Sequence, residues 1–132
     1  MRTLVGVDIQ PIGEVEESLR EFGDRYRGLI FTDQELDSCG NHPATTANLA
    51  ERFAAKEAVL KILEARESPP PWRSIEVKGG SGQPQIVLHG LAADLAHRQG
   101  LLDMSVSLSH AGGIATAVVV ASVVPERLEQ RS

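Results

Sequence analysis

The pattern that most constrains the fold is a long helix in the middle of the chain. It begins between Thr45 and Asn48 and runs to about Arg66, where the sequence SPPP ends it because proline cannot continue a helix. Helical spacing predicts an apolar stripe on this helix, and an amphipathic helix buries its stripe against another layer. The stripe consists of Leu49, Phe53, Leu60 and Leu63. One position within the stripe carries a carboxylate instead, Glu57.

The segments before the long helix predict one strand and two short helices. TLVGVDIQ, at 3–10, is mostly apolar and has no turn signal, which indicates a partly buried strand. VEESLREF has apolar residues at helical spacing, and Gly23 ends that helix. In FTDQEL, Thr32 can cap the amide of Glu35 while the Glu35 side chain reaches back, so another helix begins there.

The segments after the long helix are rich in strands. WRSIEVK and PQIVLHG flank a glycine-rich turn and predict a hairpin, which the short helix LAADLAHRQG and the strands MSVSLSH and IATAVVVAS follow. This order predicts an α+β fold in which an antiparallel sheet packs against one long and several short helices. We expect 1–124 to form a single domain and 125–132 to be a C-terminal tail.

Charge and cysteine usage narrow the class of function. The formal net charge of −5 argues against nucleic acid as a partner, because polyphosphate binding needs a basic face. The apolar runs are too short to cross a membrane. Cys39 is the single cysteine, so an internal disulfide is excluded and a reducing, cytoplasmic setting is the default. Arg20, Arg25 and Arg27 form either a small positive patch or three solvated arginines.

Two carboxylates occupy positions where an isolated charge is costly. Strand alternation places Asp8 among apolar neighbours, and Glu57 interrupts the apolar stripe of the long helix. If the helix packs on the sheet through that stripe, both carboxylates meet at one seam and form an oxygen-only site, which favours Mg²⁺ over zinc. The alternative is that Glu57 pairs with Lys61 one turn later while Asp8 caps a turn.

Three further features are weaker signals. His110 shares a predicted strand face with Val106 and Leu108, which is typical of a histidine at the edge of the core bonded to backbone. The glycines of 79–82 could offer backbone N–H groups to a phosphate, although hairpin glycines normally supply positive φ. Cys39 has no arrangement of histidine partners and is interpreted as a small apolar residue.

Five short motifs follow one another along the chain: GVDI, FTDQEL, RFAAKEAVLK, GQP and LSHAGGIATAVVV. In this order they resemble the holo-acyl-carrier-protein synthase family of 4′-phosphopantetheinyl transferases, over residues 4 to about 122. The resemblance implies that family's fold and a Mg²⁺-dependent reaction. In that reaction the 4′-phosphopantetheine arm of coenzyme A moves to a serine of an apo acyl carrier protein, and adenosine 3′,5′-bisphosphate is released.

The resemblance also implies roles for particular residues. Asp8 and Glu57 match the family's ligands for Mg²⁺ at the pyrophosphate of coenzyme A. Lys61 matches a lysine suited to a phosphate contact or to assisting deprotonation of the carrier serine, so Lys61 and Glu57 would carry the catalysis. The positions near the nucleotide end of coenzyme A are matched by Gly82, Pro84 and His110.

The expected assembly is a homotrimer that binds coenzyme A between subunits. The chain is too short to enclose the whole cofactor, and its strand at 114–120 is strongly apolar. The trimers of the resembled family bind the cofactor in this way. Asp8 and Glu57 would then come from one subunit, and His110 with the 82–84 turn from its neighbour.

Two departures from the family pattern keep alternatives open. Glu14 stands where members commonly have an arginine that grips the acidic carrier protein, and Gln83 stands where a basic residue is frequent. The first departure keeps open a transferase dedicated to a polyketide or peptide synthase carrier domain. A rival from another class is a non-catalytic coenzyme A-binding module, against which the retention of both carboxylates and Lys61 argues.

Overall fold

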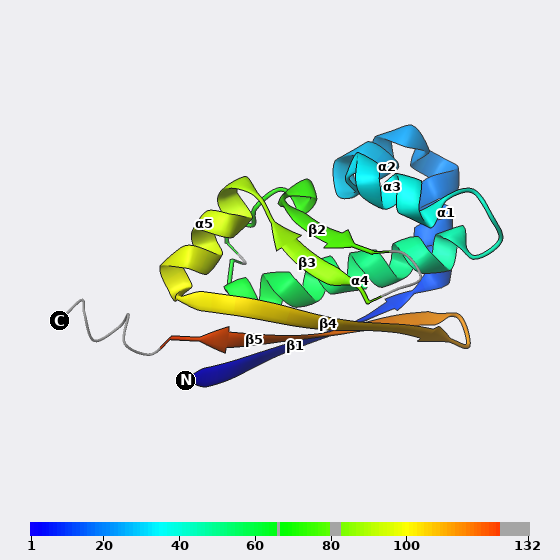
Figure 1. The fold of residues 1–132 in the computed structure, drawn as a ribbon. Helices are drawn as coiled ribbons and strands as arrows, with labels where there is room; N and C mark the ends of the chain where they lie inside the picture. Colours follow the sequence, from blue (N-terminus) through cyan, green and yellow to red (C-terminus); the bar gives the residue numbers. More distant parts are fainter. Residues whose placement is uncertain (66, 80–82, 125–132) are drawn as a thin grey trace.

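A computed structural model describes residues 1–65, 67–79 and 83–124 of the chain, so Arg66, Gly82 and the expected tail at 125–132 lie outside the described residues. The elements confirm the α+β prediction, and Figure 1 shows their arrangement. In chain order they are β1 (Arg2–Pro11), α1 (Ile12–Phe22), α2 (Asp24–Ile30), α3 (Asp33–Cys39), α4 (Thr45–Leu63), the 3₁₀ turn η1 (Trp72–Ser74), β2 (Ile75–Lys78), β3 (Gln85–Leu88), α5 (Gly90–Gln99), β4 (Leu101–Ala111) and β5 (Ile114–Val123).

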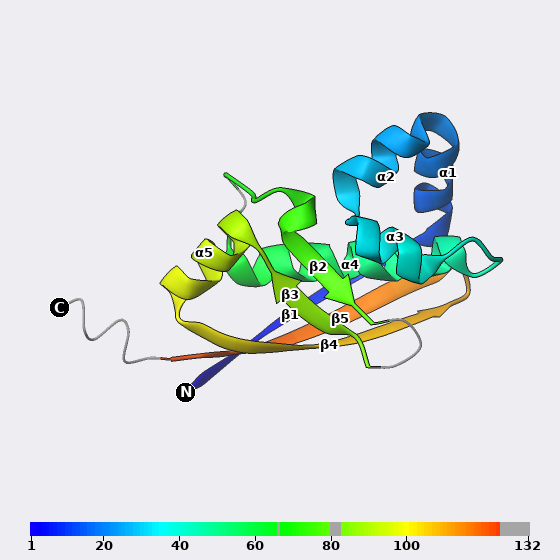
Figure 2. The same ribbon diagram turned by 45° about the horizontal axis from the view of Figure 1, so that its top comes forward.

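The strands form two antiparallel sheets that lie on opposite sides of α4. The larger sheet has the order β1-β5-β4, and β2 and β3 form the separate hairpin. The ladder between β1 and β5 runs from Arg2 opposite Val123 to Pro11 opposite Ile114. Figures 1 and 2 both show the hairpin and α5 across α4 from the larger sheet, with α1, α2 and α3 gathered at one end. The long helix is therefore the middle layer of the molecule.

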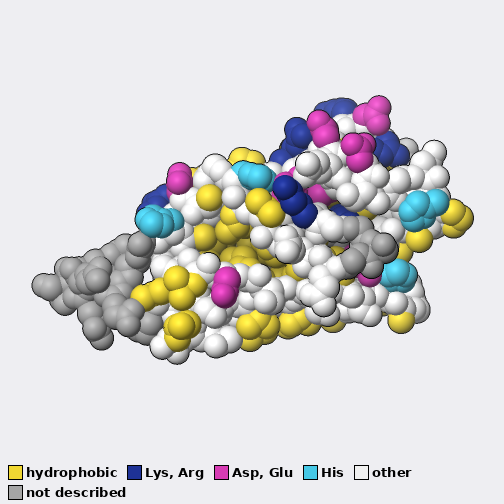
Figure 3. Space-filling model, viewed as in Figure 1, with side chains coloured by type: hydrophobic (Ala, Val, Ile, Leu, Met, Phe, Trp, Pro, Cys, Tyr) yellow, Lys and Arg dark blue, Asp and Glu magenta, His cyan; other side chains and the backbone are white. Residues whose placement is uncertain are grey.

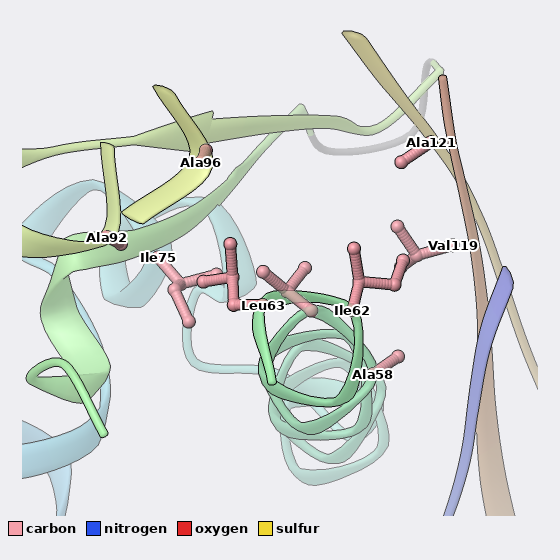
Figure 4. Packing of buried hydrophobic residues seen from close by; sticks show 9 residues of the cluster. Ala58, Ile62, Leu63, Ile75, Ala92, Ala96, Val119 and Ala121 are labelled. Atoms are coloured by element: carbon pink, nitrogen blue, oxygen red, sulfur yellow. The ribbon is translucent and has the colours of Figure 1, made fainter. Parts of the chain in front are cut away.

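Small residues bring α4 close to the larger sheet. The helix and β5 contribute matching small and branched residues to shared clusters: Ala50, Ala54, Ala58 and Ile62 from α4, and Ala115, Ala117, Val119 and Ala121 from β5. A Cβ at Gly6 of β1 would run into the Ala58 carbonyl oxygen, so only glycine permits this approach. Figure 4 shows Ala58 and Ile62 on the side of α4 that faces Val119.

The expected packing face of α4 was wrong. Leu49 and Phe53 pack in a cluster formed mainly by α1, α2, α3 and Trp72, to which the larger sheet contributes Ala115, because the alanine row takes the side that faces the sheet. The helix also ends at Leu63, earlier than expected, where Glu64 adopts the left-handed conformation with φ 54°. The helix therefore ends before the SPPP segment that was expected to stop it.

The outer face of the larger sheet is apolar over β1 and β5 and is exposed in the single chain. Strand alternation turns Val5, Val7 and Ile9 of β1 away from α4, and they are 60%, 48% and 61% exposed. Val118 and Val120 of β5 lie opposite Val7 and Val5 and are also exposed. These five residues are called the outer valine face below.

Candidate active site

Asp8 meets Lys61 where β1 runs along α4. The Asp8 side chain is 16% exposed, and its Oδ1 accepts a hydrogen bond from Lys61 Nζ at 3.0 Å. The same ammonium donates to the carbonyl oxygen of Val7 at 2.7 Å. Asp8 lies within the β1 ladder opposite Ala117, so the alternative that it caps a turn was wrong.

Glu57 is the second carboxylate at this point. Burial raises the pKa of Glu57, the negative charge of Asp8 raises it further, and Lys61 acts in the opposite direction. The two carboxylates therefore interact, although α4 packs on the sheet through its alanine row instead of the predicted stripe. Among the described residues, Lys61 forms its ion pair with Asp8 and not with Glu57, so the alternative pairing at i and i+4 was also wrong.

A cavity opens beside this carboxylate pair. It measures about 440 Å³ and is lined by Glu57, Leu60, Lys61, Ala65, Pro69, Pro70 and Trp72. The Trp72 ring packs on Phe53, with ring centroids 5.1 Å apart, which fixes one wall against α4. The cavity thus combines apolar walls with a charged end formed by Glu57 and Lys61.

A fully buried ion pair supports the Trp72 wall from the core side. Lys56 and Glu35 are fully buried, with Nζ 2.8 Å from Glu35 Oε1. Lys56 Nζ also donates to the carbonyl oxygens of Ile75 at 2.6 Å and Trp72 at 3.1 Å. Glu35 accepts from the amide of Val77 as well as closing the predicted capping box, so this network joins α3, α4, η1 and β2.

A second cavity lies toward the other end of α4. It measures about 850 Å³ and is lined by Ser38, His42, Asn48, Glu51, Arg52, Gln83, Pro84, Val106, Ser107 and Leu108. The sequence prediction placed Pro84 near a bound nucleotide, and Pro84 does line this space. Among the described residues, none lines both this cavity and the one beside Glu57.

His110 is bonded to Glu51, which lines the second cavity, and this partner differs from the one expected. Its Nδ1 is 2.9 Å from Oε2 of Glu51, so the expectation of a backbone partner was wrong. Arg52 donates to the carbonyl oxygens of Asn48 at 3.2 Å and Gly79 at 2.7 Å, and no partner is found among the described residues for its buried Nε. Sequence reasoning missed Glu51 and Arg52, for which the available signal was a pair of adjacent charges in the first half of a buried helix.

The arginines of α1 and α2 do not form a purely positive patch. Arg20 lies 3.7 Å from Glu16 and Arg27 lies 3.1 Å from Asp24, each within its own helix. Figure 3 shows basic and acidic side chains mixed over this end of the molecule. Phe22 and Leu29 are exposed on the same two helices, so the surface combines charge of both signs with apolar side chains.

Three remaining expectations concern cysteine, metal clusters and membranes. Cys39 is buried, and burial raises the pKa of its thiol to about 11, which confirms the interpretation as a small apolar residue. Within the described ranges no three His, Cys, Asp or Glu side chains gather as a metal cluster. No helix in that part of the chain is long and apolar enough to span a membrane.

Comparison with known proteins identifies the class. A family model for the 4′-phosphopantetheinyl transferase superfamily matches residues 4–119, so the chain belongs to this superfamily. The holo-[acyl-carrier-protein] synthase of Leptospira biflexa is 39% identical over 118 residues, covering 88% of this chain and 93% of the relative. That of Chlamydia trachomatis is 40% identical over 119 residues, covering 89% of this chain and 97% of the relative.

A solved structure agrees with these relatives. The ACPS–CoA complex from Chronobacterium ammoniagenes has a TM-score of 0.79 at 30% identity, and the match covers 94% of this chain and 99% of that chain. The resemblance read from the sequence motifs is thereby confirmed. Within the superfamily, the chain is an enzyme of the holo-[acyl-carrier-protein] synthase type.

Proposed function

We propose that the enzyme transfers the 4′-phosphopantetheine arm of coenzyme A to a serine of an apo acyl carrier protein and releases adenosine 3′,5′-bisphosphate. The observation that carries the proposal is the meeting of Asp8, Glu57 and Lys61 at the charged end of an apolar cavity. Relatives named for this reaction and solved complexes of such relatives with CoA support the choice of both substrates.

The residues at the charged end fit the demands of this transfer. The serine Oγ bonds to the β-phosphorus of coenzyme A, the bond from that phosphorus to the bridging oxygen of the nucleotide breaks, and the serine proton is lost. Lys61 Nζ, which is partly exposed, can donate to the phosphate oxygens on which negative charge builds up. Glu57, with its raised pKa, is a candidate to accept the serine proton when it does not hold metal.

Asp8 and Glu57 fit Mg²⁺ as its protein ligands. Their mutual repulsion shows in the raised pKa of Glu57, and a divalent cation relieves such repulsion. Two carboxylates suit an ion that commonly takes its other ligands from water and substrate phosphates. When bound, Mg²⁺ would neutralise charge on the pyrophosphate oxygens.

The two cavities suit the two ends of coenzyme A. The walls formed by Leu60, Pro70 and Trp72 are apolar and accept the pantetheine arm next to the reacting phosphate. The larger cavity contains Arg52, whose guanidinium is buried and has an unpartnered Nε among the described residues, and this favours an anionic nucleotide. Gln83 lines the same space and adds no charge there.

A homotrimer with shared sites is the assembly that we propose. The outer valine face is an apolar surface on the single chain, and such surfaces mark contacts between proteins. The two cavities share no described lining residue: Glu57 lines one, and Glu51, the partner of His110, lines the other. Glu57 of one subunit and His110 of its neighbour would then serve one coenzyme A molecule. Glu57→Gln and His110→Ala variants, each nearly inactive, should then partly rescue one another when refolded as mixed trimers. A monomeric mass in solution would contradict the shared site.

The carrier protein is proposed to bind on α1 and α2. Arg20, Arg25 and Arg27 offer positive charge for an acidic carrier, and the exposed Phe22 and Leu29 offer apolar contacts beside it. Glu14 lies in the first turn of α1, where a negative charge disfavours an acidic partner. This observation supports a second candidate, a transferase dedicated to a polyketide or peptide synthase carrier domain.

Mass spectrometry of carrier proteins tests the function directly. The enzyme is incubated with coenzyme A, Mg²⁺ and a panel of apo carriers that includes fatty-acid, polyketide and peptide types. The addition of one phosphopantetheine to a carrier supports the transferase, and the carrier that gains it distinguishes the two candidates. An unmodified panel together with tight coenzyme A binding would instead favour a non-catalytic binding module.

A further inference from the structure

The larger cavity has a carboxylate in its wall, although the proposed ligand is an anion. Glu51 lies on α4 with 12% of its side chain exposed, and its Oε2 is 2.9 Å from Nδ1 of His110. We infer that Glu51 is a positioning residue that holds the His110 ring, with Nε2 free, for the nucleotide end of coenzyme A. The inference rests on the proposed function, because it takes coenzyme A as the ligand.

His110 needs such a partner because its own strand does not fix the ring. It is the second-last residue of β4, an edge strand of the larger sheet, two residues before Gly112 of the turn. The His110 side chain remains 42% exposed, so packing leaves it free to rotate. The bond to Glu51 joins the end of β4 to the first half of α4 and fixes the ring beside the cavity.

The chemistry of a carboxylate also selects the tautomer of the ring. An ionised carboxylate only accepts hydrogen bonds, so Nδ1 of His110 must carry the hydrogen that Glu51 accepts. The other nitrogen, Nε2, is then left for the ligand, as an acceptor in the neutral ring and as a donor in the protonated one. Without Glu51 the ring loses both its fixed rotamer and its fixed tautomer.

The charges nearby show why Glu51 must act through His110. Arg52 follows it in the sequence and attracts an anion, whereas the carboxylate of Glu51 repels one. If Glu51 only repelled the ligand, its removal would make the protein bind the ligand more tightly. Holding His110 gives Glu51 an effect of the opposite sign, and a glutamine can retain that effect because its Oε1 accepts the same hydrogen bond.

Calorimetric titration with coenzyme A separates these two effects. We expect Glu51→Ala to weaken coenzyme A binding by about fivefold to tenfold, which is the size of one lost hydrogen bond. Glu51→Gln should retain most of the parental affinity. The control is Asp94→Ala, which removes an exposed carboxylate on α5, outside the lining of the larger cavity. Equal or tighter binding by Glu51→Ala would overturn the inference.

A double-mutant cycle and nitrogen NMR complete the test. In a His110→Ala background the difference between Glu51→Ala and Glu51→Gln should vanish, because the residue through which Glu51 acts is gone. Long-range ¹H–¹⁵N spectra in alkaline buffer should show His110 as the Nδ1–H tautomer in the parent and as a mixture in Glu51→Ala. His110→Ala identifies the relevant signals among the four histidines. A persistent difference in the cycle, or an unchanged tautomer, would overturn the inference.

The outcomes also distinguish this inference from the proposed function. A parent that binds coenzyme A but modifies no carrier defeats the proposed transfer, while the Glu51 effect on affinity and tautomer still supports the inference. A parent that modifies carriers while Glu51→Ala binds coenzyme A normally defeats the inference alone. A parent that does not bind coenzyme A overturns both.

Discussion

Two lysines on α4 meet carboxylates in opposite ways. Lys56 is sealed in the core, where Glu35 and two carbonyl oxygens take all three of its N–H donors. Lys61 lines a cavity and is 47% exposed, and it is paired with Asp8. The second carboxylate near it is Glu57, whose pKa is raised by burial and by the charge of Asp8. The same residue types thus build a structural joint at one place and a reactive cluster at the other. The difference lies in whether the charges are already satisfied and whether a ligand can reach them.

The largest expected effect tests the reactive cluster. Asp8→Asn and Glu57→Gln should each lower the rate of phosphopantetheine transfer by at least about a hundredfold, because each removes a proposed ligand of the Mg²⁺ that would neutralise the pyrophosphate. The rate is measured by mass spectrometry under saturating coenzyme A, with Asp94→Asn as the matched control. Near-parental transfer by either variant would remove that carboxylate from the site.

The free energy of unfolding should depend more on Lys56, in the structural joint, than on Lys61, in the reactive cluster. Lys56→Met leaves the Glu35 carboxylate buried without a cation, so we expect the free energy of unfolding to fall by about 3–5 kcal/mol. Lys61→Met removes a partly exposed ion pair and should cost at most about 1 kcal/mol. Urea unfolding of the two variants measures both values. Equal losses would mean that the two lysines do not differ as the comparison requires.

Mg²⁺ should stabilise the folded protein through the reactive cluster alone. Mg²⁺ at ten times its dissociation constant should raise the free energy of unfolding of the parent by about 1.4 kcal/mol, through binding to the folded state alone. The increase should disappear in Glu57→Gln and in Asp8→Asn. Thermal unfolding with and without EDTA gives the comparison, and an undiminished increase in both variants would place the ion elsewhere.

The smallest effect concerns the pH dependence of stability. The pKa of Glu57 is raised in the folded protein, so the folded state holds this proton more tightly than the unfolded state does. Stability from this group is fully present below the unfolded pKa and is lost as the pH rises through the folded pKa. In metal-free buffer Glu57→Gln should therefore gain stability relative to the parent on going from acidic to neutral pH. The gain should be at most about 1 kcal/mol because solvent screens the partly buried charge. A stability difference between parent and variant that does not change with pH would show that folding does not raise the pKa of Glu57.

Local chemistry made much of the fold predictable. The capping box at Thr32 and Glu35 was confirmed because its hydrogen bonds join residues that are neighbours in sequence. The packing face of α4 was wrong because the sequence interpretation followed the large apolar residues, whereas close approach to a sheet selects small ones. Gly6 opposite Ala58 shows this requirement, and it became visible only once β1 and α4 were placed side by side.

The site was predictable only in part, for a related reason. Asp8 and Glu57 were found because each is a charge in an apolar pattern, and that signal needs no knowledge of the partner. Lys56 and Glu51 were missed because Glu35 and His110, their partners, are distant in sequence. For Glu35, a recognised local role in the cap concealed its second role in the core.

The strand order has a consequence for how the chain comes into being. β5 lies between β1 and β4 and is the last strand of the described residues, so neither outer strand of this sheet has a ladder partner until β5 has been synthesised. During synthesis on the ribosome the larger sheet therefore stays open until residues 114–123 leave the exit tunnel, and until then the alanine row of α4 lacks its β5 partners. A nascent chain arrested before Ile114 should show no cooperative unfolding, whereas the released chain should. Formation of the larger sheet thereby depends on the emergence of a single late strand, β5.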